Sequence, residues 1–159
     1  MIIGKKCIFA ENRSPMKKFP DTDGATPRLT LANDLRQVSL LTGFVDRVRE
    51  EYDLTPALAA RINLALEEAV CNVIQYAYPE GTTGKMCLEA VKEGNRLRFS
   101  LTDGGKVFDP TAVPEADISA SVEDRPIGGL GIHLIRSIMD SVRYERKDGK
   151  NVLTMFINL

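Results

Sequence analysis

Residues 64–72 read Leu-Ala-Leu-Glu-Glu-Ala-Val-Cys-Asn, and this stretch decides how the rest of the chain is interpreted. Apolar residues recur around it at helical spacing, and a Thr55-Pro56 pair of the kind that starts helices precedes it. The pattern predicts a helix from residue 55 to about residue 78, with Thr55 as its N-cap and one apolar face turned toward the core.

Two polar residues of this stretch, Glu68 and Asn72, stand at positions i and i+4 and therefore share one face of the predicted helix. An asparagine oxygen is a hard ligand suited to Mg²⁺, a metal usually shared with substrate phosphates. A carboxylate one turn away can accept a proton from an attacking hydroxyl or water. An exposed Glu–Asn pair is also common on amphipathic helices, so this pair needs support from elsewhere in the chain.

The rest of the chain predicts a small set of strands and two further helices. Residues 29–31 are expected as a short strand that leads, through Asn33 as N-cap, into a helix up to about residue 52. The other expected elements are strands at 85–92, 96–102, 142–146 and 151–157 and a helix at 130–139. Helices precede and interrupt antiparallel hairpins. The predicted class is therefore α+β, a two-layer sandwich with helices packed on one face of a mixed, mostly antiparallel sheet.

A second polar patch, Asp-Gly-Gly-Lys-Val-Phe-Asp, follows one of these strands at residues 103–109. Asp103 ends the strand, and Gly104 and Gly105 let a flat ligand slide against bare backbone. An ionised aspartate only accepts hydrogen bonds, so it suits an exocyclic amine such as that of adenine. Taken alone, Asp-Gly-Gly is equally typical of a plain turn.

A third patch, with Gly128, Gly129 and Gly131, opens the predicted helix at 130–139. Helix N-terminal N–H groups favour phosphate, and glycine lets the backbone approach closely. Arg125, in the loop just before, is placed to touch a terminal phosphate, although a solvated loop arginine is an equal alternative. His133 has no metal or nucleophile partner near it in the sequence and is expected to be a surface or partly buried residue.

Bulk properties exclude several classes of protein. The 159 residues suit one domain, and the formal net charge of −1 gives neither a basic footprint for direct nucleic-acid binding nor a polybasic membrane patch. No apolar run approaches the ~20 residues that a membrane span needs. The three cysteines form no metal-ligand spacing and no disulfide framework, which indicates a reducing, cytoplasmic setting. We expect residues 1–27 to be an N-terminal extension or linker and residues 28–159 to be the domain.

In order, the three patches resemble the N, G1 and G2 boxes of the ATPases typified by gyrase, histidine kinases and the mismatch-repair protein MutL, the GHKL superfamily with its Bergerat-type ATP-binding fold. The helix at residues 64–72 and the Phe108-Asp109-Pro110 segment look more like one branch, the bacterial anti-sigma factor serine-protein kinases, also called histidine-kinase-like regulatory ATPases. The resemblance covers about residues 29–159.

The resemblance implies a role for each matching residue. Asn72 would bind Mg²⁺, Glu68 would be the general base, and Asp103 would read the adenine amine of ATP with Gly105 beside it. Thr154, in the last strand, matches the threonine that supports the same adenine contact. Gly129, Leu130 and Gly131 would bind the phosphates at the start of the helix. The segment between Phe108 and Ile127, which contains Arg125, would be the lid over the nucleotide, and Phe108 and Arg125 would contribute to nucleotide binding.

Two positions depart from the family pattern. Val107 stands where the G1 box often has its second glycine, and Tyr76 stands where kinases of this group often carry a histidine, four residues after the metal-binding asparagine. The second departure concerns the local details of catalysis rather than ATP binding.

The implied function is that of an ATP-dependent serine-protein kinase and anti-sigma factor. It would phosphorylate an anti-anti-sigma protein of the STAS type, which gains roughly −2 charge and undocks, and would then sequester a sigma factor. By resemblance it would act as a homodimer. A non-catalytic ATP-binding regulatory module that switches partners is the alternative. A detached sensor-kinase catalytic domain is a third, against which the chain length and the lack of a preceding helical hairpin with a phosphoacceptor histidine count.

Overall fold

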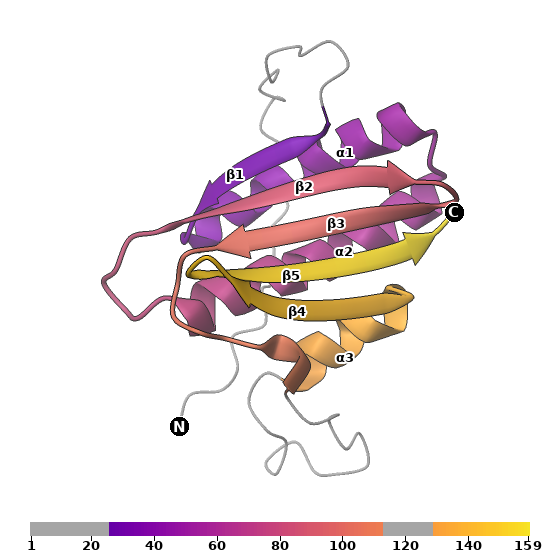
Figure 1. Cartoon of the computed structure of the whole chain (residues 1–159). Helices are drawn as coiled ribbons and strands as arrows, with labels where there is room; N and C mark the ends of the chain where they lie inside the picture. The colour runs from indigo at the N-terminus through magenta and orange to yellow at the C-terminus, as the bar shows by residue number, and fades with distance from the viewer. Residues whose placement is uncertain (1–25, 113–128) are drawn as a thin grey trace.

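The computed structural model describes residues 26–112 and 129–159, which form a five-stranded sheet with helices on one face (Figure 1). The strand order is β1-β2-β3-β5-β4, and all four pairings among these strands are antiparallel. The strands are β1 Arg28–Ala32, β2 Lys85–Glu93, β3 Arg96–Asp103, β4 Ser141–Lys147 and β5 Lys150–Asn158. The predicted two-layer α+β architecture is confirmed, without the parallel component that a mixed sheet would have. Residues 1–25, most of the expected N-terminal extension, lie outside the described residues.

The helical layer consists of α1 Leu40–Tyr52, α2 Pro56–Asn72 and α3 Gly129–Ile138, with a short 3₁₀ helix η1 Leu35–Ser39 before α1. The prediction for the start of α2 is confirmed, because the Thr55 side chain accepts a hydrogen bond from the N–H of Leu58. None of the helices in the described ranges is long and apolar enough to cross a bilayer.

The predicted N-cap at Asn33 is wrong by one residue. The cap of η1 is Asp34, whose side chain accepts from the N–H of Arg36. The Asn33 side chain instead accepts from the N–H of Gly84 and donates to the carbonyl of Thr82. Asn33 therefore fastens the end of β1 to the loop before β2, a contact between residues about fifty positions apart that local sequence rules do not contain.

The helix α2 does not stop at Asn72 but continues as the π-helical turn η2, Val73–Ala77. Wider turns of this kind release backbone groups from the regular i to i−4 pattern. Here the carbonyl of Ala77 accepts a hydrogen bond of 2.8 Å from the N–H of Lys106, in the loop after β3. The end of the α2 region is therefore attached to the end of β3.

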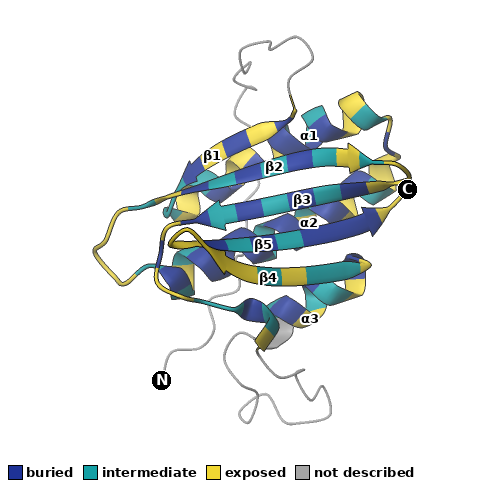
Figure 2. Ribbon diagram, viewed as in Figure 1, coloured by how far each residue is buried: buried dark blue, intermediate teal, exposed yellow. Residues whose placement is uncertain are grey.

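The core lies between the sheet and the helices, and burial alternates along the strands (Figure 2). In β3 the helix-facing residues Leu97, Phe99 and Leu101 are buried, and the register places Leu101 opposite Leu153 of β5. Alternation in period two continues to the strand end, so Asp103 shares the helix-facing side with these apolar residues. The carboxylate of Asp103 therefore lies on the face of the sheet that the helices cover.

The hairpins turn where the sequence predicted them. Gly94 has φ +62°, and Asp148 and Gly149 have φ +50° and +75°, the paired positive values of a tight two-residue turn. The second hairpin fixes β4 against β5, and β5 also pairs with β3, so the last strand in chain order is interior to the sheet.

Candidate functional site

The three polar patches of the sequence meet around the C-terminal half of α2. The glycine-led start of α3 approaches Glu68 and Asn72, and the loop after β3 approaches Ala77, at the end of the adjoining π-helical turn. Residues far apart in sequence therefore share one site, as the sequence analysis expected for a pocket built from all three patches.

At one end of this site, Glu68 and Asn72 lie next to Gly131. A Cβ atom on Gly131 would lie 2.9 Å from Glu68 Oε2 and 3.3 Å from Asn72 Nδ2, so glycine allows the close approach of α3. Asn72 is buried, with 8% of its surface exposed, and Glu68 is half-buried. Within residues 26–112 and 129–159 neither side chain has a hydrogen-bond partner. Their polar atoms are therefore available for a hydrogen bond to water or to a ligand.

Burial also changes the acidity of the carboxyl groups here. Desolvation raises the pKa of Glu68 above its ordinary value of 4.5, and no hydrogen bond or cation opposes that shift. Burial raises the pKa of the neighbouring Glu67 as well, but there a hydrogen bond of 2.8 Å from the Asn63 amide partly opposes it. The two adjacent carboxyl groups therefore differ in that only Glu67 is tied to a partner.

At the other end of the site, Asp103 is buried, with 2% of its surface exposed. Its Oδ1 accepts hydrogen bonds from the Gly105 N–H at 2.8 Å and the Asn151 amide at 3.0 Å. Among the described residues nothing donates to Oδ2. Gly105 is required by close approach, since a Cβ atom there would lie 2.4 Å from the carbonyl oxygen of Ala77.

Asn151 is the site residue that the sequence analysis missed. It is buried, with 3% of its surface exposed, and it stands directly opposite Asp103 in the β3–β5 register. A polar residue in phase with the buried Leu153 and Met155 of the same strand was the available signal, because alternation places all of them on the helix-facing side.

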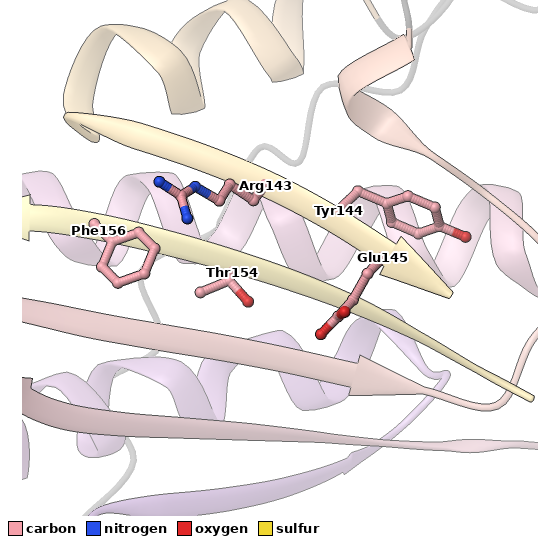
Figure 3. Close-up of a pocket in the computed structure, with 5 residues that line it drawn as sticks. All are labelled: Arg143, Tyr144, Glu145, Thr154 and Phe156. Atoms are coloured by element: carbon pink, nitrogen blue, oxygen red, sulfur yellow. The ribbon is translucent and has the colours of Figure 1, made fainter. Parts of the chain in front are cut away.

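The structure does not bring Thr154 to Asp103. Thr154 pairs with Ser100, and both belong to the set of strand positions that face away from the helices. Figure 3 shows Thr154 between Phe156 and Glu145, in an open surface pocket of about 330 Å³ on that other face. The physical reason is parity: Thr154 is three positions from Asn151 on one strand, and an odd step reverses the side of the sheet.

The aromatic rings of Phe108 and Tyr76 pack against each other. Their ring centroids are 5.2 Å apart at an interplanar angle of 30°, and burial raises the pKa of the Tyr76 hydroxyl. Tyr76 therefore packs on the first aromatic residue of the segment expected to be the lid.

Some predicted site residues cannot be placed. Arg125 and Gly128 lie outside the described residues, as does most of the segment expected to be the lid. Gly129 and Leu130 form the first backbone positions of α3, where a phosphate-binding helix start was predicted. His133 is exposed on the same helix, in agreement with its expected surface position.

A helix-covered antiparallel sheet, with a glycine-led helix start packed against a carboxylate and an amide, is the arrangement of a nucleotide-binding ATPase domain. The sequence agrees, because residues 31–157 match the family model described as the histidine kinase-like ATPase domain. The chain belongs to this family, which confirms the resemblance seen in its motifs.

Two curated relatives and one solved structure show how far the similarity extends. The chain is 29% identical over 94 residues to the serine/threonine-protein kinase BtrW of Bordetella bronchiseptica, covering 59% of this chain and 66% of that protein. It is 34% identical over 96 residues to the serine-protein kinase RsbW of Bacillus cereus, covering 58% of this chain and 59% of that one. The matched regions thus span less than two thirds of these relatives. The crystal structure of the RsbU and RsbW domains of a Mycobacterium tuberculosis protein shares the fold, with a TM-score of 0.58 and 17% identity over 84% of this chain and 33% of the other.

Proposed function

We propose that this chain is an ATP-dependent serine-protein kinase in which Glu68 acts on the hydroxyl of the acceptor. The observation that carries the proposal is the state of Glu68. It is half-buried, has a pKa raised by burial, lies one turn from Asn72 and beside Gly131, and has no hydrogen-bond partner within the described residues. The names of the two kinase relatives support the same activity.

The base of ATP would bind at the β3 end of the site. Asp103 Oδ2, to which no described residue donates, would accept a hydrogen bond from the exocyclic amine of adenine. Gly105 lets the loop pack closely against Ala77. Because glycine has no side chain, the backbone beside the Asp103 carboxylate would leave room for a flat ring.

The phosphates would bind at the start of α3. The first N–H groups of a helix point outward without intrahelical partners, and the helix dipole favours negative charge there. Asn72 would contribute one oxygen ligand to Mg²⁺. The described residues contain no group of three acidic, histidine or cysteine side chains that could hold a metal by themselves. Phosphate oxygens and water would complete the coordination of the ion, which is the usual way in which Mg²⁺ is bound. Mg²⁺ would supply charge neutralisation on the phosphates.

In the transfer step the acceptor hydroxyl oxygen bonds to the γ-phosphorus, and the bond from that phosphorus to the β–γ bridging oxygen breaks. Glu68 would orient the hydroxyl and take its proton. A carboxylate whose pKa is raised by burial is a stronger base than an exposed glutamate. Positioning and charge stabilisation do most of the work in phosphoryl transfer, so a small catalytic set suffices.

The partners belong to the proposal as well. We propose that the acceptor is an anti-anti-sigma protein of the STAS type and that the second partner is a sigma factor, held by a cytoplasmic homodimer. Phosphorylation would add roughly −2 charge to the acceptor and release it. The supporting observation is the resemblance of the motifs to anti-sigma factor kinases, together with relatives named serine-protein kinases.

Titration with MgATP followed by transfer of labelled γ-phosphate to a STAS-type protein from the same genome tests the proposal. The key variant is Glu68→Gln, and the matched control is Glu67→Gln, the adjacent carboxyl that burial shifts in the same direction but that is hydrogen-bonded to Asn63. We expect wild type and Glu67→Gln to label a serine, and Glu68→Gln to bind ATP without labelling. ATP binding with no labelling by any variant, using an acceptor shown to bind the chain, would favour the non-catalytic regulatory module. A wild type that does not bind ATP would overturn the assignment of the site.

A further inference from the structure

Asn151 uses its entire hydrogen-bonding capacity inside the protein. Its amide donates to Asp103 Oδ1 at 3.0 Å and to the Lys106 carbonyl at 2.9 Å. Its Oδ1 accepts from the Tyr144 hydroxyl and from Arg146 Nη1, each at 2.8 Å, and forms a longer hydrogen bond of 3.4 Å with the Phe108 N–H. An asparagine side chain has two donor hydrogens and two acceptor lone pairs, so the four shorter of these bonds already satisfy it completely.

The orientation of this amide follows from the chemistry of its partners. Arg146 can only donate, so it must face the amide oxygen of Asn151. The Lys106 carbonyl and an ionised Asp103 can only accept, so they must face the amide nitrogen. The Phe108 N–H also can only donate. Rotating the amide by 180° would therefore oppose donor to donor or acceptor to acceptor at four contacts. Arg146 also donates to the Gly105 carbonyl at 3.0 Å, so one exposed guanidinium ties β4 to both the amide and the turn after β3.

This orientation determines which oxygen of Asp103 remains available. The Gly105 N–H and the Asn151 amide both bind Oδ1, and no other described residue donates to the carboxylate. Oδ2 is left as an acceptor without a donor. An oxygen in that state gains a hydrogen bond from an exocyclic amine and repels a carbonyl oxygen at the same position of the ring.

We propose that Asn151 is a positioning residue that, oriented by Arg146 and Tyr144, presents Asp103 Oδ2 to the amino group of a purine. It thereby sets the preference of this site for an amino-purine nucleotide over one that lacks the amine. The inference rests on the proposed binding of ATP and adds the residues that determine base recognition at that site.

The test combines changes in the protein with a change in the nucleotide, in the manner of a double-mutant cycle. Dissociation constants are measured for ATP and for the otherwise identical nucleotide whose purine carries hydrogen in place of the 6-amino group. Because a hydrogen bond to a charged group is strong, we expect the wild type to bind ATP about tenfold to a hundredfold more tightly than the nucleotide without the amine, and this factor is the ratio of their dissociation constants. We expect this ratio to fall to about threefold or less in Asn151→Leu and to fall at least threefold in Arg146→Met.

The Arg146→Met variant keeps the test decisive if Asn151→Leu does not fold, because Arg146 is exposed and its removal leaves the core intact. Arg143→Met is the matched control, the same substitution on the same strand but on the other face of the sheet, and it should keep the wild-type ratio. If folded variants weaken both nucleotides by the same factor, Asn151 is merely structural and the inference is overturned while ATP binding stands. If the wild type binds neither nucleotide, the proposed function fails and the inference falls with it.

Discussion

The two ends of the candidate site are built in opposite ways. At the end formed by β3 and β5, Asp103 and Asn151 are held by hydrogen bonds from within the protein. At the end formed by α2 and α3, Glu68 and Asn72 have no hydrogen-bond partner in the described part of the chain. We infer that the base-recognition end is organised by the fold itself, whereas the phosphate end keeps its polar groups for ligand, metal and acceptor.

The difference has a physical origin in the elements that supply each end. Side chains at paired strand ends have directions fixed by register, and neighbouring strands can satisfy them across the ladder. Side chains at the contact of two helices meet only what the second helix presents, and at Gly131 that is bare backbone. Changes at the two ends should therefore disturb different properties of the protein.

The largest expected effect is on chemistry at the phosphate end. Replacing Glu68 with glutamine removes the group that we propose takes the proton, and we expect the transfer rate to fall on the order of 10²- to 10⁴-fold. ATP affinity should change by less than about threefold, because an isosteric side chain keeps the packing. Single-turnover transfer and equilibrium binding, measured on the same preparation, separate the two quantities. A parallel loss of affinity and rate would mean that Glu68 belongs to the binding surface rather than to the chemistry.

The next effect concerns stability at the base end. A Cβ atom at Gly105 would lie 2.4 Å from the Ala77 carbonyl oxygen, which belongs to the backbone and cannot move cheaply. We expect Gly105→Ala to lower the free energy of unfolding by about 2–3 kcal/mol through overpacking. Urea denaturation of this variant is compared with that of Gly104→Ala, where a Cβ atom would meet nothing within 4 Å. Equal stability of the two variants would show that the end of β3 is less rigid than its contacts indicate.

A smaller effect is expected from the same substitution at the other end. A Cβ atom at Gly131 would meet the Glu68 carboxylate at 2.9 Å, the mobile tip of a side chain, while alanine favours the helix. Gly131→Ala should therefore change the free energy of unfolding by less than about 1 kcal/mol. Transfer should still fall about tenfold, because the displaced carboxylate is misaligned. Thermal melting and the transfer assay report the two outcomes. A loss of stability as large as that of Gly105→Ala would contradict the proposed difference between the two ends.

The smallest effect is a pH dependence of stability from Glu68. Burial raises its pKa in the folded protein above the ordinary value of 4.5, so the folded state binds this proton more tightly than the unfolded state. The stability associated with the neutral carboxyl is therefore present below the unfolded pKa and is lost as the pH rises through the folded pKa. Wild type and Glu68→Gln should have similar stability near pH 4, and the variant should be more stable near pH 7.

The expected difference near pH 7 is less than about 1 kcal/mol, because the half-buried carboxylate keeps part of its hydration. Urea unfolding of both proteins at each pH measures it. Groups with lowered pKa values, such as Asp34 and Glu93, are common to both proteins and cancel in the difference. A variant that is less stable than wild type at neutral pH would mean that Glu68 has a favourable partner in the fold.

Much of the fold and half of the site could be predicted because the signals were local. The Thr55 cap, the spacing of Glu68 and Asn72, and the Asp148-Gly149 turn each depend on residues a few positions apart. The position of Asn151 beside Asp103 depends on a strand register between residues 48 positions apart. Resemblance assigned the supporting role to Thr154, and only the register shows that this side chain faces the other way.

Two further features had no local signal at all. The π-helical turn after Asn72 extends the predicted helix with the expected residues but a different hydrogen-bond pattern, which brings the Ala77 carbonyl to Lys106. Asn33 satisfied the rule for a helix cap, yet its side chain binds the loop before β2. In both cases a long-range partner outweighs the local preference.

The interior position of β5 has a consequence for biosynthesis. The ribosome synthesises β3, α3 and β4 before β5, Lys150–Asn158, which pairs with both β3 and β4 in the folded sheet. Until that segment emerges, both of its future neighbours expose open edges, the kind of surface on which nascent chains associate wrongly. Asp103, which we propose contacts the base, is translated before Asn151, which we propose orients it. We therefore expect discrimination between nucleotides to require the entry of β5 into the sheet, which places Asn151 beside Asp103.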